Sequence, residues 1–383
     1  MKKQPAVVIV GGGPVGLVLA LMLARREIAS EVLDARALEA AQADRRLLAL
    51  SRGTLQLLRP LAALPPAVTA PIRRVLVSSA GEFGRVELGN DDGEPEPLGL
   101  TIRYGDLLAP LAQACSRSGL VSVSRPSRVT AIRQQPARAV VQLDDGTSRE
   151  AQIVVNAEGL GAPPPASVPT QCALLADVIL QGPAAGSAFE RFTRDGPLAL
   201  LPLPAAVDAG RAMGLVWCMP PEAAARRTAL GDPEFLADLQ GAFGARNGKF
   251  LRVGPRSRVP LHQQARESLR EHRVVYLGNA AQTLHPVAGQ GFNLGVRDCA
   301  SLADSLARAR VEQRDFATAL GDYDRGRRAD RAAILALTRN APALFSTRAA
   351  PIAFGRSLAL TALSMFPDLR RQFARLLMFG VRS

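Results

Sequence analysis

The chain is poor in the residues that build metal sites and disulfide frameworks. Among its 383 residues there are only four cysteines and three histidines. No two cysteines form a CxxC pair, which indicates a reducing compartment and argues against a disulfide scaffold. The histidines are not spaced as a ligand pair with one another or with a cysteine, so we expect no metal. These residues are Cys115, Cys172, Cys218, Cys299, His262, His272 and His285.

Aromatic residues are also scarce. They make up 4% of the chain, although the formal net charge is +13 and the pI is near 10.8. A nucleic-acid site would interleave stacking aromatic residues with basic ones, and the arginines here are scattered without them. We therefore expect no nucleic acid as a partner. The hydrophobic content of 48% suffices for a large core in two or three domains.

One apolar run, residues 6–24, is long enough to imitate a membrane span or the core of a signal peptide. A glycine cluster and Pro14 interrupt it, and no small-residue cleavage site follows. Parallel strands that are covered on both faces also read as unbroken apolar runs. We therefore expect a cytoplasmic protein.

A glycine-rich turn near the N-terminus has the pattern of a dinucleotide-binding site. The apolar run VVIV precedes it, and a leucine-rich helical pattern follows over 17–24. Gly11 allows a tight turn, Gly13 lets a pyrophosphate approach the backbone, and Gly16 lets helix and strand pack closely. Asp34 ends the next predicted strand, where it would bind ribose hydroxyls. The alternative is a glycine-rich turn that binds nothing, which would not require this order of strand, helix and acid.

A second glycine-rich loop lies in the C-terminal third. Residues 274–277 are typical of a buried strand, and residues 294–307 carry leucines at helical spacing. Glycines between them let backbone N–H groups approach a ligand. A helix that begins just after these glycines directs the positive end of its dipole at that ligand. This arrangement favours a phosphate, or a ring that becomes anionic on reduction.

Together the two segments resemble those of the FAD-dependent aromatic-ring hydroxylases, most closely the ubiquinone-biosynthesis branch. Residues 278–286 read GNAAQTLHP and continue to Asp298 in the pattern of that branch, with Asn279 where most flavin hydroxylases carry aspartate. Arg46, ahead of Ala-Leu-Ser, matches the family arginine that contacts FAD. The resemblance covers almost the whole chain. Motifs similar to the 2-polyprenyl-6-methoxyphenol hydroxylases are FERFT at 189–193, GPLALLP at 196–202 and VWC at 216–218.

The patterns and the resemblance predict an α/β fold: a Rossmann-like FAD-binding domain with an inserted β-sheet substrate domain and a helical C-terminus. Alternating stretches at 74–78 and 200–203 favour a sheet in the inserted parts. The two domains should pack tightly around the flavin. We expect the FAD-binding domain at 1–70, 101–160 and 268–340, the substrate domain at 71–100 and 161–267, and a C-terminal helical segment at 341–383.

The resemblance implies a monooxygenase with FAD and NAD(P)H as cofactors and a polyprenylated phenol as substrate. NAD(P)H reduces FAD, O2 adds to the reduced ring, and a flavin hydroperoxide hydroxylates the phenol. The amides of Gly289, Gln290 and Gly291 are the expected stabilisers of the reduced ring. Pro286 would wall the ring together with Val287. The residues expected to hold FAD are Gly11, Gly13, Gly16, Asp34, Arg46, Asn279, Gly291, Phe292 and Asn293.

His285 is a candidate for proton movement near neutral pH, although a histidine in a crowded turn is more often structural. No residue stands out from the sequence as the catalytic base. Asn279 can hydrogen-bond hydroxyl groups without adding negative charge near a flavin that must become anionic.

One segment departs from the family pattern. Residues 157–165 read AEGLGAPPP, where the family shows Ala-Asp-Gly followed by a serine and an arginine. In the family this segment takes part in handling the nicotinamide donor. An accessory protein that binds FAD but consumes no NAD(P)H is therefore an alternative. Another is a different FAD oxidoreductase of a prenylated substrate, although Trp217 alone cannot form the paired-tryptophan motif of halogenases.

The C-terminus predicts a basic amphipathic helix. It would lie on an anionic membrane surface, which suits a substrate dissolved in lipid, or dock on the protein's own core. We therefore expect peripheral contact with the inner face of the membrane, and the resemblance adds other ubiquinone-biosynthesis enzymes as partners. Removal of residues 367–383 should lower membrane association and spare the flavin site. The helix combines Leu369, Phe373, Leu376 and Leu377 with Arg370, Arg371 and Arg375.

Overall fold

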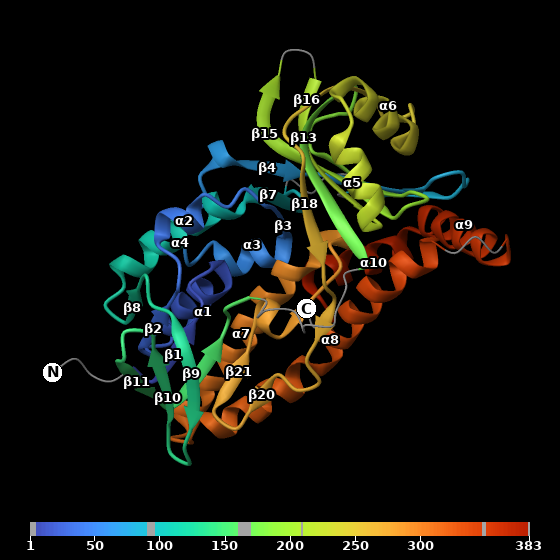
Figure 1. Cartoon of the computed structure of the whole chain (residues 1–383). Coiled ribbons are helices and arrows are strands. Elements are labelled where there is room, and N and C mark those ends of the chain that lie inside the picture. Colours follow the sequence, from blue (N-terminus) through green and yellow to red (C-terminus); the bar gives the residue numbers. More distant parts are fainter. Residues whose placement is uncertain (1–4, 90–95, 160–169, 208–209, 347–349, 382–383) are drawn as a thin grey trace.

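The computed structural model describes residues 5–89, 96–159, 170–207, 210–346 and 350–381. Two large sheets occupy different parts of the molecule, and the helices of the C-terminal half run beside both (Figure 1). The predicted α/β class with a helical C-terminus is confirmed.

A six-stranded sheet organises the part of the molecule around the N-terminal motif. Neighbouring strands are parallel, except that β20 and β21 are antiparallel. Strand β1 is central, so the glycine-rich turn that follows it lies at the middle of the sheet. The strand order is β20 (Arg270–Glu271), β21 (Val274–Tyr276), β12 (Ile153–Asn156), β1 (Val7–Val10), β2 (Ser30–Leu33) and β8 (Val121–Ser124).

Strand β1 and the helix after it are apolar because both are covered on all sides. The residues of β1 are at most 1% exposed, as expected for a parallel strand with helices on both faces. Helix α1 (Pro14–Ala24) contacts both α4 (Tyr104–Arg117) and α7 (Gln290–Val311). Burial in the protein thus explains the apolar run at 6–24. In the described ranges, no helix is long and apolar enough to cross a membrane.

An eight-stranded sheet gathers the segments predicted to be sheet from their alternation. The pair β14 and β5 is parallel and the other pairs are antiparallel. Two strands from the first quarter of the chain therefore join strands from its middle. The order is β17 (Lys249–Val253), β13 (Gln171–Gln181), β16 (Gly210–Met219), β15 (Pro197–Val207), β14 (Ser187–Phe192), β5 (Arg74–Ser79) and β6 (Arg85–Gly89), with β18 (Ser257–Leu261) also paired to β13.

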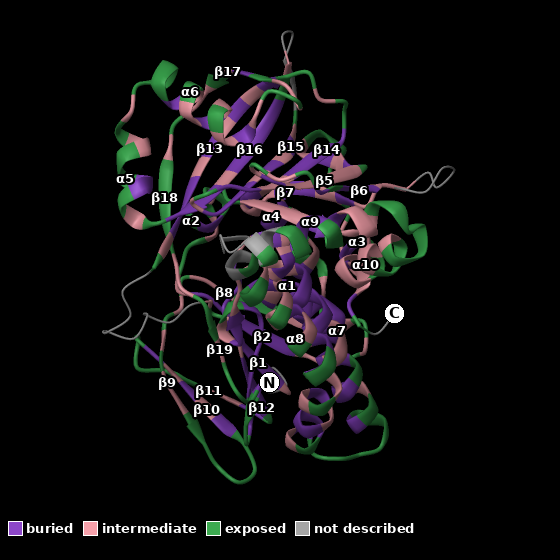
Figure 2. Cartoon of the chain, turned by 90° about the vertical axis from the view of Figure 1, so that its right-hand side faces the viewer, coloured by how far each residue is buried: buried purple, intermediate pink, exposed green. Residues whose placement is uncertain are grey.

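Helices of the C-terminal half connect the two sheets. Helix α8 (Phe316–Ser346) packs along α7 and also contacts β14. Helix α9 (Ala350–Met365) packs on β6, and α10 (Pro367–Phe379) packs on α3 (Arg52–Leu58). Figure 2 shows buried residues along the strands of both sheets, while α5 (Pro221–Ala229) and α6 (Asp232–Phe243) carry exposed residues at the edge.

Shorter elements complete the fold. One small sheet has the order β3 (Leu47–Ser51), β7 (Gly99–Arg103) and β4 (Thr69–Ile72), and another has β11 (Ser148–Ala151), β10 (Ala139–Leu143) and β9 (Val129–Gln134). The remaining elements are α2 (Leu38–Gln42), η1 (Pro66–Val68), the pair β19 (Gln264–Ala265) and β22 (Gln282–Thr283), η2 (Gly278–Ala280) and η3 (Val287–Gly289).

Candidate active site

The N-terminal glycines bring backbone segments closer together than side chains would allow. Gly11 has φ +105°, and a Cβ there would lie 2.5 Å from the carbonyl carbon of Ala157. A Cβ on Gly16 would overlap the carbonyl oxygen of Gly11. The turn after β1 therefore fits tightly between the end of β12 and the first turn of α1. Of the segment that departs from the family, residues 157–159 run here and residues 160–165 lie outside the described ranges.

The second glycine-rich loop packs directly on the first. A Cβ on Gly295, in α7, would lie 3.2 Å from a methyl group of Val15 in α1. A Cβ on Gly278, at the start of η2, would lie 3.4 Å from the same side chain. Asn279 is the next residue and is exposed beside the first turn of α1. The two motifs found in the sequence thus meet in one place.

The N-terminus of α1 is open to an anion. Its N-cap residue, Gly13, provides no side-chain hydrogen bond, and the first turn contains no acidic residue. Free N–H groups and the helix dipole at such an end favour phosphate. Tyr104 borders the same space, because a Cβ on Gly13 would lie 2.6 Å from its hydroxyl oxygen. Arg46 stacks on the Tyr104 ring, with its guanidinium carbon 4.8 Å from the ring centroid.

Asp34 lies directly after β2 and is held beside the same turn. Its Oδ2 accepts a hydrogen bond from the Gly12 amide at 2.7 Å, and its Oδ1 accepts one from the Arg36 amide at 2.8 Å. The guanidinium group of Arg125 adds an ion pair, with Nη1 3.7 Å from Oδ2. The sequence did not identify Arg125 as a partner of Asp34, because Arg125 directly follows β8 and belongs to no recognisable motif.

A second open helix N-terminus lies at the start of α7. Ala288 and Gly289, directly before it, both have φ +58°. A non-glycine residue in this region stores roughly 1–3 kcal/mol of strain, so its surroundings impose the shape of the loop. The first turn of α7 has no side-chain cap and no acidic residue. At Gly291 a Cβ would meet no atom within 4 Å, so the backbone there borders open space.

Asn293 holds this loop from inside the protein. Its Oδ1 accepts from the Ser51 amide at 2.9 Å, and its Nδ2 donates to the carbonyl oxygens of Ala49 and Gly289 at 2.9 and 2.8 Å. The residue is 2% exposed. Its amide thus ties α7 to β3, and its contact with the flavin stays a prediction. The adjacent Phe292 is half-buried against the core.

His285 precedes the loop, and both of its ring nitrogens are engaged. Its Nδ1 accepts from the Val287 amide at 3.3 Å, which leaves Nε2 to donate to Gln171 Oε1 at 2.9 Å. Burial lowers the pKa of His285 to about 4, so the ring is neutral at physiological pH. Pro286 follows as the half-buried N-cap of η3. This geometry favours the structural role for His285 over proton movement.

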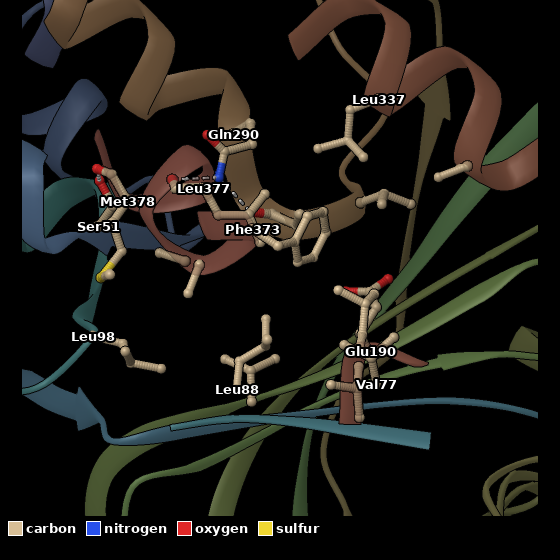
Figure 3. A pocket seen from close by; sticks show the side chains of 18 of the residues that line it. Ser51, Val77, Leu88, Leu98, Glu190, Gln290, Leu337, Phe373, Leu377 and Met378 are labelled. Carbon is tan, nitrogen blue, oxygen red and sulfur yellow. Dashed lines mark hydrogen bonds between the residues drawn. The ribbon is translucent and has the colours of Figure 1, made fainter. Parts of the chain in front are cut away.

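An apolar cavity of about 330 Å³ lies between this loop and the eight-stranded sheet. Figure 3 shows Gln290 and α10 on one side of it, with Leu88 and Val77 on the sheet opposite. Gln290 Nε2 donates to the carbonyl oxygens of Ala288 and Leu377 at 3.2 and 3.1 Å, which joins the loop to α10. The apolar lining includes Val77, Leu88, Leu98, Val287, Leu337, Leu360, Phe373 and Leu377.

Glu190 is an acid on the wall of this cavity. Its side chain extends from β14 toward the interior of the cavity (Figure 3). Burial raises the pKa of Glu190 to about 7, and a hydrogen bond from the Ala288 backbone partly offsets this rise. Its Oε1 is buried without a hydrogen-bond partner among the described residues. The sequence contained Glu190 only within the motif FERFT, and nothing local indicates the direction of its side chain.

The C-terminal helix α10 closes the cavity and is anchored to the core. The Met378 carbonyl oxygen accepts from Ser51 Oγ at 2.9 Å, and the Val381 amide donates to Asp330 Oδ1 at 3.1 Å. Asp330 belongs to a buried ion cluster, in which Arg297 and Arg327 lie 2.9 and 2.5 Å from its Oδ2.

This docking supports one of the two alternatives for the C-terminal helix, namely that it packs on the protein's own core. Phe373 and Leu377, predicted on the apolar face of α10, line the cavity rather than face outward. Removal of residues 367–383 would therefore open the cavity, while the expectation that it spares the flavin site stays a prediction. The same deletion would leave Gln290 Nε2 and Ser51 Oγ without their carbonyl partners on α10.

Glu190→Gln should stabilise the protein in a pH-dependent way. The ordinary pKa of this carboxyl is 4.5 and its value in the folded protein is about 7, so the folded state holds the proton more tightly than the unfolded state. The free energy of unfolding of the wild type is therefore highest below pH 4.5. It declines as the pH rises through 7, because the buried carboxyl must then ionise. The variant avoids this loss and should gain about 3 kcal/mol over that interval.

Chemical denaturation across this pH range measures the difference. The exposed Glu87→Gln, on strand β6 of the same sheet, should show no comparable trend. A stability difference between Glu190→Gln and wild type that stays constant with pH would contradict the burial of the carboxyl group.

Comparisons with known proteins identify close sequence relatives. The ubiquinone hydroxylase UbiL of Rhodospirillum rubrum is 32% identical over 388 residues, which cover 97% of this chain and 89% of that protein. The 3-demethoxyubiquinol 3-hydroxylase of Escherichia coli is 29% identical, over 97% of this chain and 98% of that protein.

Solved structures share the fold. p-Nitrophenol 4-monooxygenase PnpA of Pseudomonas putida has a TM-score of 0.76 at 16% identity, over the full length of both chains. PqsL of Pseudomonas aeruginosa, in complex with 2-aminobenzoylacetate, has a TM-score of 0.75 at 19% identity, over 93% of this chain and 100% of that one. A family model described as FAD binding domain matches residues 4–338. The chain therefore belongs to the FAD-binding-domain family.

Proposed function

We propose that the protein is an FAD-dependent monooxygenase that hydroxylates the aromatic ring of a polyprenylated phenol in ubiquinone biosynthesis, with NAD(P)H and O2. The observation that carries this proposal is the apolar cavity that meets the loop before α7. A ring with a long apolar tail and one hydroxyl group suits such walls. Two relatives that match almost the whole chain are named as hydroxylases of ubiquinone or its precursor.

FAD fits the two glycine-rich segments. Its pyrophosphate would lie at the N-terminus of α1, where Gly13 leaves N–H groups free and no acid repels it. Asp34 would bind the ribose, and the open backbone at Gly291 leaves room for the flavin ring. Bound FAD supplies the redox chemistry with NAD(P)H and O2. The residues proposed to hold it are Gly11, Gly13, Gly16, Asp34, Arg46, Asn279, Gly291 and Phe292.

The protein's own residues would position the reactants and control charge. The amides at Gly289, Gln290 and Gly291, with the dipole of α7, favour negative charge on the ring. Pro286 and Val287 would wall the ring. The apolar side chains of the cavity would keep water from the reacting atoms.

The two large sheets suggest that different parts of the chain bind the cofactor and the substrate. We propose that residues 1–70, 101–160 and 268–340 bind FAD, and that residues 71–100 and 161–267 bind the phenol. Residues 341–383 add α9 and α10, which close the cavity over β5 and β6.

The test of this function is an anaerobic titration of the FAD-loaded protein with NADPH and then NADH, in the presence of a prenylated phenol. Flavin bleaching, followed on aeration by a hydroxylated product in mass spectrometry, is the expected result. Bound FAD that stays oxidised would contradict the proposal and favour an FAD-binding accessory protein. Bleaching without a hydroxylated product would favour another oxidoreductase of a prenylated substrate.

Gly13→Glu should abolish FAD binding. The new side chain would fill the approach to the N-terminus of α1 and place a negative charge where the pyrophosphate is expected. The control is Gly119→Glu, because Gly119 is exposed and a Cβ there would meet no atom within 4 Å. Flavin absorbance of the purified proteins measures occupancy, and full occupancy in Gly13→Glu would refute the placement of the pyrophosphate.

We further propose that α9 and α10 contact an anionic bilayer, from which the substrate enters. Phe354, Met365 and Leu369 are 61%, 69% and 46% exposed on these helices, whereas Leu360 and Leu363 of α9 face the cavity. Arg375, on α10, is exposed and would face lipid headgroups. Helix α9 would thus separate the cavity from the membrane surface.

Replacement of Phe354, Met365 and Leu369 by serine should weaken binding to phosphatidylglycerol vesicles by about tenfold or more, because apolar area no longer enters the bilayer. Co-sedimentation measures the change. Val311→Ser is the control, since Val311 is 84% exposed at the end of α7. Unchanged partition of the triple variant would exclude this surface.

A further inference from the structure

Most polar side chains on the cavity wall already have partners within the protein. The Ser51 hydroxyl donates a hydrogen bond to α10, and the Asn293 side chain is hydrogen-bonded to β3 and to the loop before α7. Gln290 Nε2 donates to two carbonyl oxygens. Arg356 is likewise bonded within the protein. In the described part of the chain, the buried oxygen atoms on this wall that lack a partner are Gln290 Oε1 and Glu190 Oε1.

Gln290 Oε1 is an acceptor, and Glu190 Oε1 is an acceptor when the carboxyl is ionised, so a ligand with a hydrogen-bond donor would satisfy both. A buried acceptor without a donor is unfavourable, and a hydroxyl group would satisfy it. The two groups differ in one respect: the carboxylate of Glu190 can take up a proton, whereas the amide of Gln290 cannot.

Glu190 also lies beside the reactive part of the site. The backbone of Ala288 lines the same cavity and lies close enough to the carboxyl to lower its pKa. Ala288 directly precedes the three amides at the start of α7. A hydroxyl group bound to Glu190 would therefore hold its ring next to this loop. The apolar remainder of the cavity extends away from it, toward the side chains of α9 and α10.

We propose that Glu190 is the general base of the hydroxylation and accepts the proton of the phenolic hydroxyl of the substrate. This inference rests on the proposed function. The phenolic O–H bond breaks as a new O–H bond forms on the carboxylate. The freed electron pair moves into the ring and makes its ortho and para carbons more reactive toward an electrophilic oxygen. The proton leaves Glu190 for solvent before the next turnover.

The titratable groups on the elements that surround Glu190 and the cavity are consistent with this role. Cys218, on β16, remains a thiol because burial raises its pKa. His285 is neutral, with a pKa of about 4, and Arg191, on β14, donates to Ser78 Oγ and the Ala242 carbonyl oxygen. Arg356, across the cavity on α9, pairs with Glu82. Burial raises the pKa of Glu190 itself to about 7, where a base is effective near neutral pH.

The first test uses the full-length, FAD-loaded protein with a prenylated phenol. In Glu190→Gln, product formation should fall by about 100-fold or more, while FAD occupancy and anaerobic reduction by NAD(P)H stay at wild-type levels. The wild-type kcat should rise with pH through about 7, and this rise should be absent in the variant. A ring-fluorinated phenol, which ionises at lower pH, should restore part of the variant's rate. Glu87→Gln should behave as wild type.

The second test needs no turnover and therefore separates this inference from the proposed function. The oxidised protein is titrated with the prenylated phenol and with its methyl ether, and binding is followed through the flavin spectrum. Above pH 7 the wild type should prefer the phenol by about tenfold or more, because the carboxylate accepts a charge-assisted hydrogen bond. Glu190→Gln should lose most of this preference.

The outcomes separate as follows. A Glu190→Gln protein that keeps the wild-type rate, pH profile and phenol preference overturns the role of Glu190. A variant that loses rate but keeps the wild-type pH dependence, and gains nothing from the fluorinated phenol, also overturns it, since only positioning would then be affected. A wild-type protein that prefers the phenol but forms no hydroxylated product leaves Glu190 as its binding partner and refutes the proposed function instead.

Discussion

The whole site depends on a contact between backbone segments that leaves no room for side chains. Gly11 and Gly16 fit α1 against the end of β12, while Gly278 and Gly295 let η2 and α7 close on the same helix. This contact brings two uncapped helix N-termini close together. A side chain at Gly11 or Gly16 would separate these ends, and their N–H groups could no longer both reach the proposed FAD. The close packing therefore determines where the positive ends of the two helix dipoles lie.

The cavity next to this contact combines features that are unfavourable for folding. A carboxyl group is buried with one oxygen unpartnered, and the adjacent Ala288 adopts a left-handed conformation. Both residues line the same cavity, and the backbone of Ala288 lowers the pKa of the Glu190 carboxyl. Local strain and uncompensated polar groups persist only where the surrounding structure is stable enough to impose them. Here the docked α10 and the ion cluster around Asp330 hold the loop in place.

The sequence predicted the glycine contact well and the cavity poorly, for a physical reason. Turns such as that of Gly11 follow from local backbone conformation, so motif and spacing reveal them. Glu190 and Phe373 come from a strand and a helix whose directions depend on contacts made far along the chain. An apolar stripe on α10 fits a bilayer and a protein core equally well, and only packing decides between them. The sequence motif placed Asn293 at the loop before α7. Its hydrogen bonds with β3 join residues more than 240 positions apart, so no local pattern could reveal them.

The hydrogen bond between Ser51 and the Met378 carbonyl oxygen joins positions 327 residues apart. Contacts of such separation require large loops to close, and chains rich in them fold slowly. The wall that α10 provides can therefore form only after the segment around Ser51 and the C-terminal helix have come together. The apolar cavity is thus completed only when residues from the two ends of the chain have met.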